Sequence, residues 1–423
     1  MRVLLISANT EQINMPVLPM GLACLAEATK RAGHEVELLN LMAAQGSGSA
    51  LREALNRFSP ELIGISVRNI DDQSMTETRF LLDSAKDVVN ECRNFTTAPI
   101  VLGGAGYSIF PRSVLAYLNA DMGIRGEGES SFVDLLKRIR SGNDFSNIPG
   151  LILREAGNSE KPQPIRNLDA YEIPPPHLLG CSGNSEEIWV PFQTRRGCPM
   201  ECSYCSTAAI EGKIIRKRTP KLAVESMSRY VEAGFDRFFF VDNTFNLPPS
   251  YARELCKEIT AAKLKISWRA ILYPWKISEK LIELMAKAGC KEVSLGFESG
   301  SKKILQAMNK RFEPEEVGRI SGLLKKYGIH SMGFLLLGGP GETKETVEES
   351  LDFADSLDLE SLKVTVGIRI YPHTLLARIA RSEGIISRAD NLLFPRFYVN
   401  RQIEEWIGET VHNRMKKRPH WHI

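Results

Sequence analysis

Short apolar runs alternate with longer amphipathic stretches through the first 140 positions of this 423-residue chain. The amphipathic stretches carry apolar residues at helical spacing, as in Gly21–Ala32, which ends at the helix-stopping Gly33. Strands that each precede a helix predict a parallel sheet covered on both faces, with ligands bound at the carboxyl ends of the strands. The apolar runs predict these strands at Val3–Ser7, Val36–Leu39, Leu62–Val67, Ile100–Leu102 and Met122–Ile124.

A second alternation of strands and helices begins at Ile188. Six strands with helices between them favour a partial barrel of parallel strands, whose active site lies at the carboxyl ends of the strands. The strands are expected at Ile188–Gln193, Arg237–Val241, Ile266–Ile271, Glu292–Phe297, Met332–Leu337 and Val364–Tyr371.

Proline, glycine and serine gather between the two alternations, which is typical of a domain boundary. We predict an N-terminal doubly wound, Rossmann-like domain over residues 1–140 and a linker over 141–187. Within the linker, Gly150–Arg154 and Gln163–Arg166 are expected to pair as a hairpin across Gly157–Asn158. The barrel is placed at 188–390. A C-terminal tail follows at 391–423, and its end, His420–His422, is expected to be disordered.

The composition of the chain excludes several classes of protein. Apolar residues make up 43% of the chain and charged residues 25%, which excludes a mainly disordered protein. No apolar run approaches the ~20 residues of a membrane span. The net charge of +3 gives no reason to expect nucleic acid as a partner. The apolar stretch at the N-terminus is too short for a signal peptide, so we expect a cytoplasmic protein.

Three of the eight cysteines form the motif C-x-x-x-C-x-x-C directly after the first barrel strand: Cys198, Cys202 and Cys205. No fourth cysteine or histidine lies nearby. A structural zinc site and a [4Fe–4S] cluster both usually take four protein ligands. Three ligands therefore favour a cluster with one iron open to a small molecule, while a catalytic zinc site and coincidence remain alternatives.

This cysteine segment resembles the signature of radical S-adenosylmethionine (SAM) enzymes. The resemblance implies a [4Fe–4S] cluster and SAM as cofactors, with SAM chelated by the open iron. In that family the reduced cluster cleaves SAM to methionine and a 5′-deoxyadenosyl radical, within a partial (β/α)6 barrel. It also implies that Tyr204 contacts the adenine through its backbone. An electron donor such as flavodoxin or ferredoxin is expected as a partner.

Segments at the ends of later strands match the same family in order. Asp242 and Asn243 follow the second barrel strand, where the family recognises the amino group of SAM. Glu298 ends the fourth strand and is a candidate for the ribose or the amino group. Gly338 and Gly339 end the fifth, on the adenine side. A carboxylate at a strand end also commonly caps a helix, so each match is weak when taken alone.

Two arginines, Arg216 and Arg218, lie soon after the cysteine motif. They are candidates to pair with the SAM carboxylate, with an exposed basic face as the equal alternative.

The N-terminal domain resembles the cobalamin-binding domain of cobalamin-dependent radical SAM enzymes. Its glycine-rich loops, with Gly103 and Gly104 after the fourth strand and Gly126 and Glu127 after the fifth, would let the backbone approach a corrin closely. Ordinary turn chemistry is the alternative. The D-x-H-x-x-G motif of a histidine lower ligand is absent, and we interpret His34 as a surface residue.

The resemblance implies a C-methyltransferase that acts on an unactivated carbon through the 5′-deoxyadenosyl radical and methylcobalamin. One alternative is a cobalamin-dependent enzyme that forms or rearranges a ring without methylation. Another is a radical SAM enzyme whose first domain no longer binds cobalamin. A non-catalytic carrier and a zinc hydrolase fit the motifs less well. The substrate, a small molecule or a peptide, is not readable from the sequence.

Overall fold

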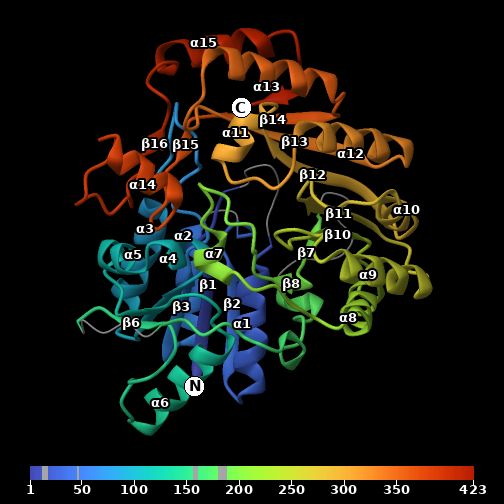
Figure 1. Ribbon diagram of the computed structural model, residues 1–423. Helices are drawn as coiled ribbons and strands as arrows, with labels where there is room; N and C mark the ends of the chain where they lie inside the picture. The colour runs from blue at the N-terminus through green and yellow to red at the C-terminus, as the bar shows by residue number, and fades with distance from the viewer. Residues whose placement is uncertain (12–17, 45–46, 156–160, 180–187) are drawn as a thin grey trace.

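The computed structural model describes residues 1–423 except 12–17, 45–46, 156–160 and 180–187. The N-terminal domain is built on a mostly parallel sheet and the barrel on a fully parallel one, and the two lie next to each other (Figure 1). The pattern of apolar runs therefore gave the fold class correctly.

The first sheet has the strand order β2-β1-β3-β4-β5-β6. Its strands are β1 (Arg2–Ser7), β2 (Glu35–Asn40), β3 (Leu62–Ser66), β4 (Ile100–Gly103), β5 (Met122–Ile124) and β6 (Leu151–Leu153). The helices are α1 (Met20–Arg31), α2 (Ser47–Phe58), α3 (Leu82–Phe95), α4 (Ala105–Ile109), α5 (Pro111–Leu118) and α6 (Glu129–Ser141). Val3–Ile6 is buried along its whole length because helices cover both faces of the sheet. In a sheet of order 2-1-3-4-5, the ligand site is expected at the carboxyl ends of the neighbouring strands β1 and β3, where the strand order reverses.

The expected hairpin in the linker is wrong. Strand β6 pairs antiparallel with β5, so it extends the first sheet beyond residue 140. The proposed turn at Gly157–Asn158 lies outside the described residues. An apolar segment such as Leu151–Ile152 buries more surface against an existing sheet than in an isolated hairpin, which is marginally stable in water.

The second sheet has the order β7-β10-β11-β12-β13-β14, with β17 at its edge. All of its pairings are parallel. Its strands are β7 (Val190–Phe192), β10 (Arg237–Phe240), β11 (Ser267–Leu272), β12 (Cys290–Glu298), β13 (His330–Leu337), β14 (Ser361–Val366) and β17 (Trp421–His422). Its helices are α8 (Pro220–Glu232), α9 (Pro249–Ala261), α10 (Glu279–Lys287), α11 (Lys302–Ala307), α12 (Pro314–Lys326), α13 (Lys344–Ser356), α14 (Leu375–Ser382) and α15 (Glu404–Met415).

Side chains alternate along the barrel strands. In β12, Val293, Leu295 and Phe297 are buried, while the alternate positions Gly296 and Glu298 are only partly covered. Period-2 alternation puts successive side chains on opposite faces of a strand. One face is therefore packed core, and the other is free to carry a site.

Two expectations for the C-terminal part are wrong. The last predicted strand is split, because β14 ends at Val366 and the separate β15 (Ile368–Arg369) pairs with β16 (Phe397–Tyr398). The end of the chain is ordered: Trp421 is buried and pairs with Leu362 in β14. Figure 1 shows α14, β15 and β16 above the first domain, and their buried residues join that domain's core.

Candidate functional site between the two sheets

The cysteine loop follows β7 at the carboxyl end of the barrel. Backbone hydrogen bonds hold it at both ends: Cys198 N donates to Gly212 O at 3.1 Å, and Ser203 N donates to Met308 O at 3.0 Å. Cys205 N donates to Cys202 O at 3.1 Å, which closes a turn within the motif. These contacts come from parts of the chain up to 105 residues away, and only the folded barrel supplies them.

The three cysteines of the motif carry free thiols. All seven cysteines within the described residues are free, and Cys198 and Cys202 are partly buried while Cys205 is exposed. Burial and the neighbouring thiols of Cys205 and Cys202 raise the pKa of Cys198 to about 11. Among the described residues, no three histidine, cysteine, aspartate or glutamate side chains converge on the position of a single metal ion. Three cysteines within eight positions of one loop are compatible with a polynuclear cluster, in which each thiolate binds its own iron.

A buried charged group lies beside this loop. Glu298 Oε1 accepts hydrogen bonds from Tyr204 Oη at 2.9 Å and from Lys310 Nζ at 3.1 Å. Burial alone would lower the pKa of Lys310, but Glu298, Tyr204 and Cys202 outweigh it and raise that pKa, so Lys310 is charged. Two residues predicted from different motifs, Tyr204 and Glu298, are therefore in contact. Lys310 was missed because it lies in a polar turn between helices, with no motif around it.

Asp242 and Asn243 are neighbours with different roles. The Asp242 carboxylate is buried and accepts hydrogen bonds from Thr194 and from both the backbone and the guanidinium of Arg195. It fixes the turn that leads into the cysteine loop, which differs from the expected contact with SAM. Asn243 faces a cavity and donates from Nδ2 to Glu211 Oε2 at 2.5 Å.

The backbone amides of Gly338 and Gly339 are already bound within the protein. Both donate to Oε2 of Glu342, the latter at 2.6 Å. Burial raises the pKa of Glu342 to about 7, although the two amides act to lower it. The glycines end β13 as predicted, but these amides are directed to Glu342 and are not free for a ligand.

A cavity of about 500 Å³ lies between the carboxyl ends of the two sheets. Gly103, Gly104, Gly126 and Glu127 line it from the first domain, together with the ends of β1 and β3. A side chain at Gly103 would meet only Ile124 O, at 3.9 Å, so the backbone there leaves room on the cavity side. No histidine is among its described lining residues. The barrel contributes Gln193, Arg196, Glu211 and Asn243 to the same cavity.

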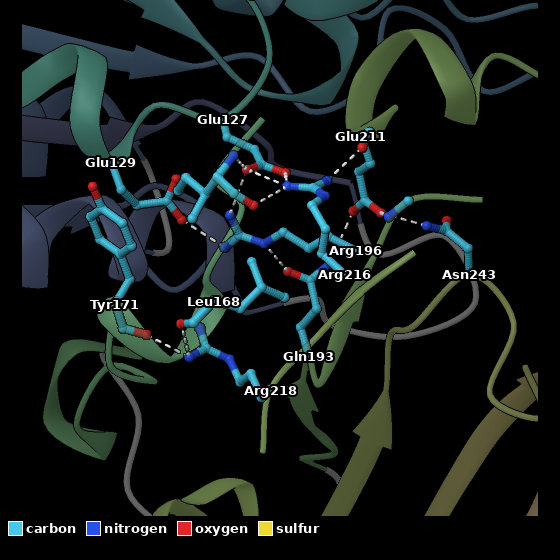
Figure 2. Close-up of polar contacts among 12 residues, drawn as sticks. Glu127, Glu129, Leu168, Tyr171, Gln193, Arg196, Glu211, Arg216, Arg218 and Asn243 are labelled. Atoms are coloured by element: carbon cyan, nitrogen blue, oxygen red, sulfur yellow. Dashed lines mark hydrogen bonds and ion pairs between the residues drawn. The ribbon is translucent and has the colours of Figure 1, made fainter. Parts of the chain in front are cut away.

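The arginines after the cysteine motif are not where either sequence interpretation placed them. Arg216 and Arg218 are buried, so they form no exposed basic face. Arg216 lies 2.6 Å from Glu127, and Arg218 donates to Leu168 O at 2.7 Å (Figure 2). Their guanidinium groups therefore hold the linker and the first domain, and neither is directed to a SAM carboxylate.

Two residues of the first domain, Tyr107 and His34, lie away from the cavity. Tyr107 is fully buried, and its ring fills the space beside Gly123, where an added Cβ would meet the ring at 2.3 Å. It is a packed aromatic of the first domain's core. His34 is half-buried at the start of β2 and does not line the cavity.

Comparisons with known proteins agree with this arrangement. The Radical SAM superfamily model matches residues 193–354, and the B12 binding domain model matches residues 6–136. The chain is 30% identical over 399 residues to an uncharacterized methyltransferase of Pyrococcus horikoshii, covering 91% of this chain and 84% of that protein. It is 25% identical over 438 residues to the tryptophan 2-C-methyltransferase of Streptomyces laurentii, covering 88% and 73%.

The chain is also similar to a protein that is named as a cyclase, the anaerobic magnesium-protoporphyrin IX monomethyl ester cyclase of Rubrivivax gelatinosus. The two are 27% identical over 84% of this chain and 65% of that protein. Among solved structures, the chain is similar to the radical SAM methyltransferase TsrM of Kitasatospora setae with cobalamin and a [4Fe–4S] cluster bound. The TM-score is 0.81 at 26% identity, over 92% of this chain and 76% of that one. A second structure of TsrM gives a TM-score of 0.86 at 24% identity, over 97% and 88%.

Proposed function

This chain belongs to the cobalamin-binding radical SAM enzymes, and from that premise we propose that it methylates an unactivated carbon of a small molecule or peptide. Its cofactors are a [4Fe–4S] cluster, SAM and cobalamin. The observation that carries the proposal is the shared cavity. Glycine-rich loops of the B12-binding domain and strand-end residues of the barrel, including Asn243, line one space beside the cysteine loop.

Different residues of the chain would bind the two metal cofactors. Cys198, Cys202 and Cys205 would hold the cluster, and Gly103, Gly104 and Gly126 would border the corrin. When bound, the cluster and SAM supply a hydrogen-abstracting radical and the cobalamin supplies the methyl group. The protein's own contribution is geometry, since reactants held in place convert a bimolecular step into an effectively unimolecular one. Beside the ion pair of Lys310 and Glu298, burial raises the pKa of Cys202, and the Lys310 ammonium acts to lower it.

The chain requires a substrate and a reductant, and we propose flavodoxin or ferredoxin as the reductant. We place the reaction in the cytoplasm, where free thiols persist. The free state of the described cysteines agrees with this compartment.

The proposal is tested with cells that contain or lack this protein, grown with methionine that carries a CD₃ group. We expect a metabolite or peptide that gains one labelled methyl group only when the protein is present. Cells with the Cys198→Ala variant are the matched control and should lack the labelled product. If no labelled species depends on the protein, the methylation proposal is wrong.

A non-methylating reaction is the second candidate, because one relative is named as a ring-forming cyclase. The same experiment separates the two. A product that depends on the protein but keeps the carbon count of its precursor would identify the cyclase type of reaction.

A further inference from the structure

Four charged side chains bridge the two domains at the edge of the cavity (Figure 2). Glu127 and Glu129 come from the end of the β5 loop and the start of α6. Arg196 and Arg216 come from a small hairpin of the barrel, formed by β8 (Arg195–Arg196) and β9 (Arg216–Lys217). We call these four residues the interdomain cluster.

The contacts within the interdomain cluster are short and shielded from water. Arg196 Nη2 donates to Glu129 Oε1 at 2.6 Å, and Arg216 Nη1 lies 2.6 Å from Glu127 Oε1. The four side chains are between 6% and 8% exposed. Charges this deeply buried keep their geometry only with a partner in place, because an unpaired buried charge is strongly unfavourable.

On the barrel side, the interdomain cluster leads directly to the cysteine loop. Arg196 precedes Gly197 and Cys198, and Gly197 N donates to Glu211 Oε2 at 2.9 Å. Gly197 has φ +93°, and a Cβ there would lie 2.2 Å from Ile214 O. The backbone between Arg196 and Cys198 is therefore tightly confined. A shift of the Arg196 backbone would therefore be passed on to Cys198, two positions further along the chain.

On the side of the first domain, the interdomain cluster adjoins the loop after β5, which borders the proposed corrin space. Glu127 and Glu129 flank Gly128, and both line the cavity with Gly126. Glu127 Oε2 also accepts a hydrogen bond from Ile165 N at 2.7 Å, which ties the linker to the same point. Two loops that we propose to hold different cofactors are thus joined by Arg196, which lies 2.6 Å from Glu129 Oε1 and 3.6 Å from Glu127 Oε2, so the pair with Glu129 is the shorter of the two.

We propose that Glu129 and Arg196 are positioning residues that set the separation between the cobalamin loop and the cluster loop. The inference rests on the proposed function, because it concerns the distance between its two metal centres. Reacting groups misplaced by about 1 Å can lose roughly 100-fold in rate, so a rigid link at this point acts directly on catalysis.

The test measures that separation in the holoenzyme, reconstituted without oxygen with iron, sulfide and hydroxocobalamin. Pulsed electron paramagnetic resonance gives the distance distribution between cob(II)alamin and the reduced cluster. Glu129→Ala, which removes the partner of Arg196, and Glu129→Asp, which shortens it by one methylene, should both broaden or shift the distribution. Glu129→Gln keeps the hydrogen bond to Arg196 and should restore the wild-type distribution. Glu53→Gln, in an exposed ion pair on α2, is the control.

Unchanged distributions in Glu129→Ala and Glu129→Asp would overturn the proposal. If Glu129→Ala does not fold, Glu129→Asp decides by the same criterion. If the wild-type protein shows no cluster signal or no cobalt signal, the proposed function itself fails and this inference with it. The spectra of the wild type therefore separate the two failures before any variant is compared.

Discussion

Arg369 donates from Nε to Oδ2 of Asp71 across 2.9 Å, although 298 positions separate the two residues in the chain. Both side chains are buried, at 3% and 1% exposed. Asp71 belongs to the segment after β3 in the first domain, and Arg369 ends β15 beyond the barrel. The guanidinium also donates to Leu392 O at 2.9 Å, so one side chain joins three distant parts of the chain.

Removing this pair should destabilise the whole protein. Arg369→Ala leaves the Asp71 carboxylate buried without its cation, and we expect a loss of about 3–5 kcal/mol in the free energy of unfolding. Arg57→Ala, which breaks exposed pairs on α2, should cost less than about 1 kcal/mol. Denaturant unfolding followed by circular dichroism measures both. Equal losses in the two variants would contradict the importance of the Asp71–Arg369 contact.

Two adjacent glycines should respond differently to substitution. Gly103→Val directs its side chain toward the cavity, where only Ile124 O lies within 4 Å. We expect this variant to fold and to bind cobalamin more weakly. Gly104 has φ +98°, and a Cβ there would lie 2.6 Å from Val67 O. Gly104→Ala should therefore cost about 1–3 kcal/mol of stability through backbone strain.

Titration of each variant with hydroxocobalamin, followed by its visible absorbance, measures the affinity for the corrin. The thermal midpoint of unfolding measures stability separately. Wild-type affinity in Gly103→Val would show that the corrin does not approach β4.

The cysteines of the motif should be individually essential for iron. Cys198→Ala, Cys202→Ala and Cys205→Ala each remove one of three thiolates, and we expect each variant to lose the cluster absorbance and the formation of 5′-deoxyadenosine. Cys256→Ala, at a buried position in α9, is the matched control and should retain full iron content. Iron analysis after anaerobic reconstitution is the measurement. Full iron in any of the three variants would remove that cysteine from the ligand set.

Glu342 should make stability depend on pH. Burial raises its pKa to about 7 in the folded protein, above its ordinary value of 4.5. The stabilisation is therefore fully present below pH 4.5 and is lost as the pH rises through 7. Between pH 5 and pH 8 the wild type should lose thermal stability, and Glu342→Gln, which mimics the protonated acid, should show a flatter profile. Parallel profiles for the two proteins would mean that Glu342 ionises normally.

No helix in the described part of the chain combines the length and the apolar character needed to cross a bilayer.

The sequence by itself determined the local chemistry and the class of fold. A continuous apolar run such as Val3–Ile6 is typical of a strand that is buried on both faces, so its burial can be predicted from its composition. The spacing of Cys198, Cys202 and Cys205 is likewise a local pattern that can be recognised without the rest of the chain. The segments that resemble the radical SAM family also placed Glu298 and Gly338 at the ends of their strands, because such a resemblance depends on short stretches of sequence.

The tertiary structure alone decided which polar groups meet. Asp242 pairs with Arg195, Glu298 with Lys310, Glu129 with Arg196 and Glu127 with Arg216, and the members of a pair lie between 12 and 89 positions apart in the chain. A buried charge requires a partner, but its sequence neighbours do not reveal which one, because the pairing depends on how the two sheets dock. Strand β6 joined the first sheet and Trp421 joined the second because each buries apolar surface against a sheet that its own neighbours in the sequence do not supply.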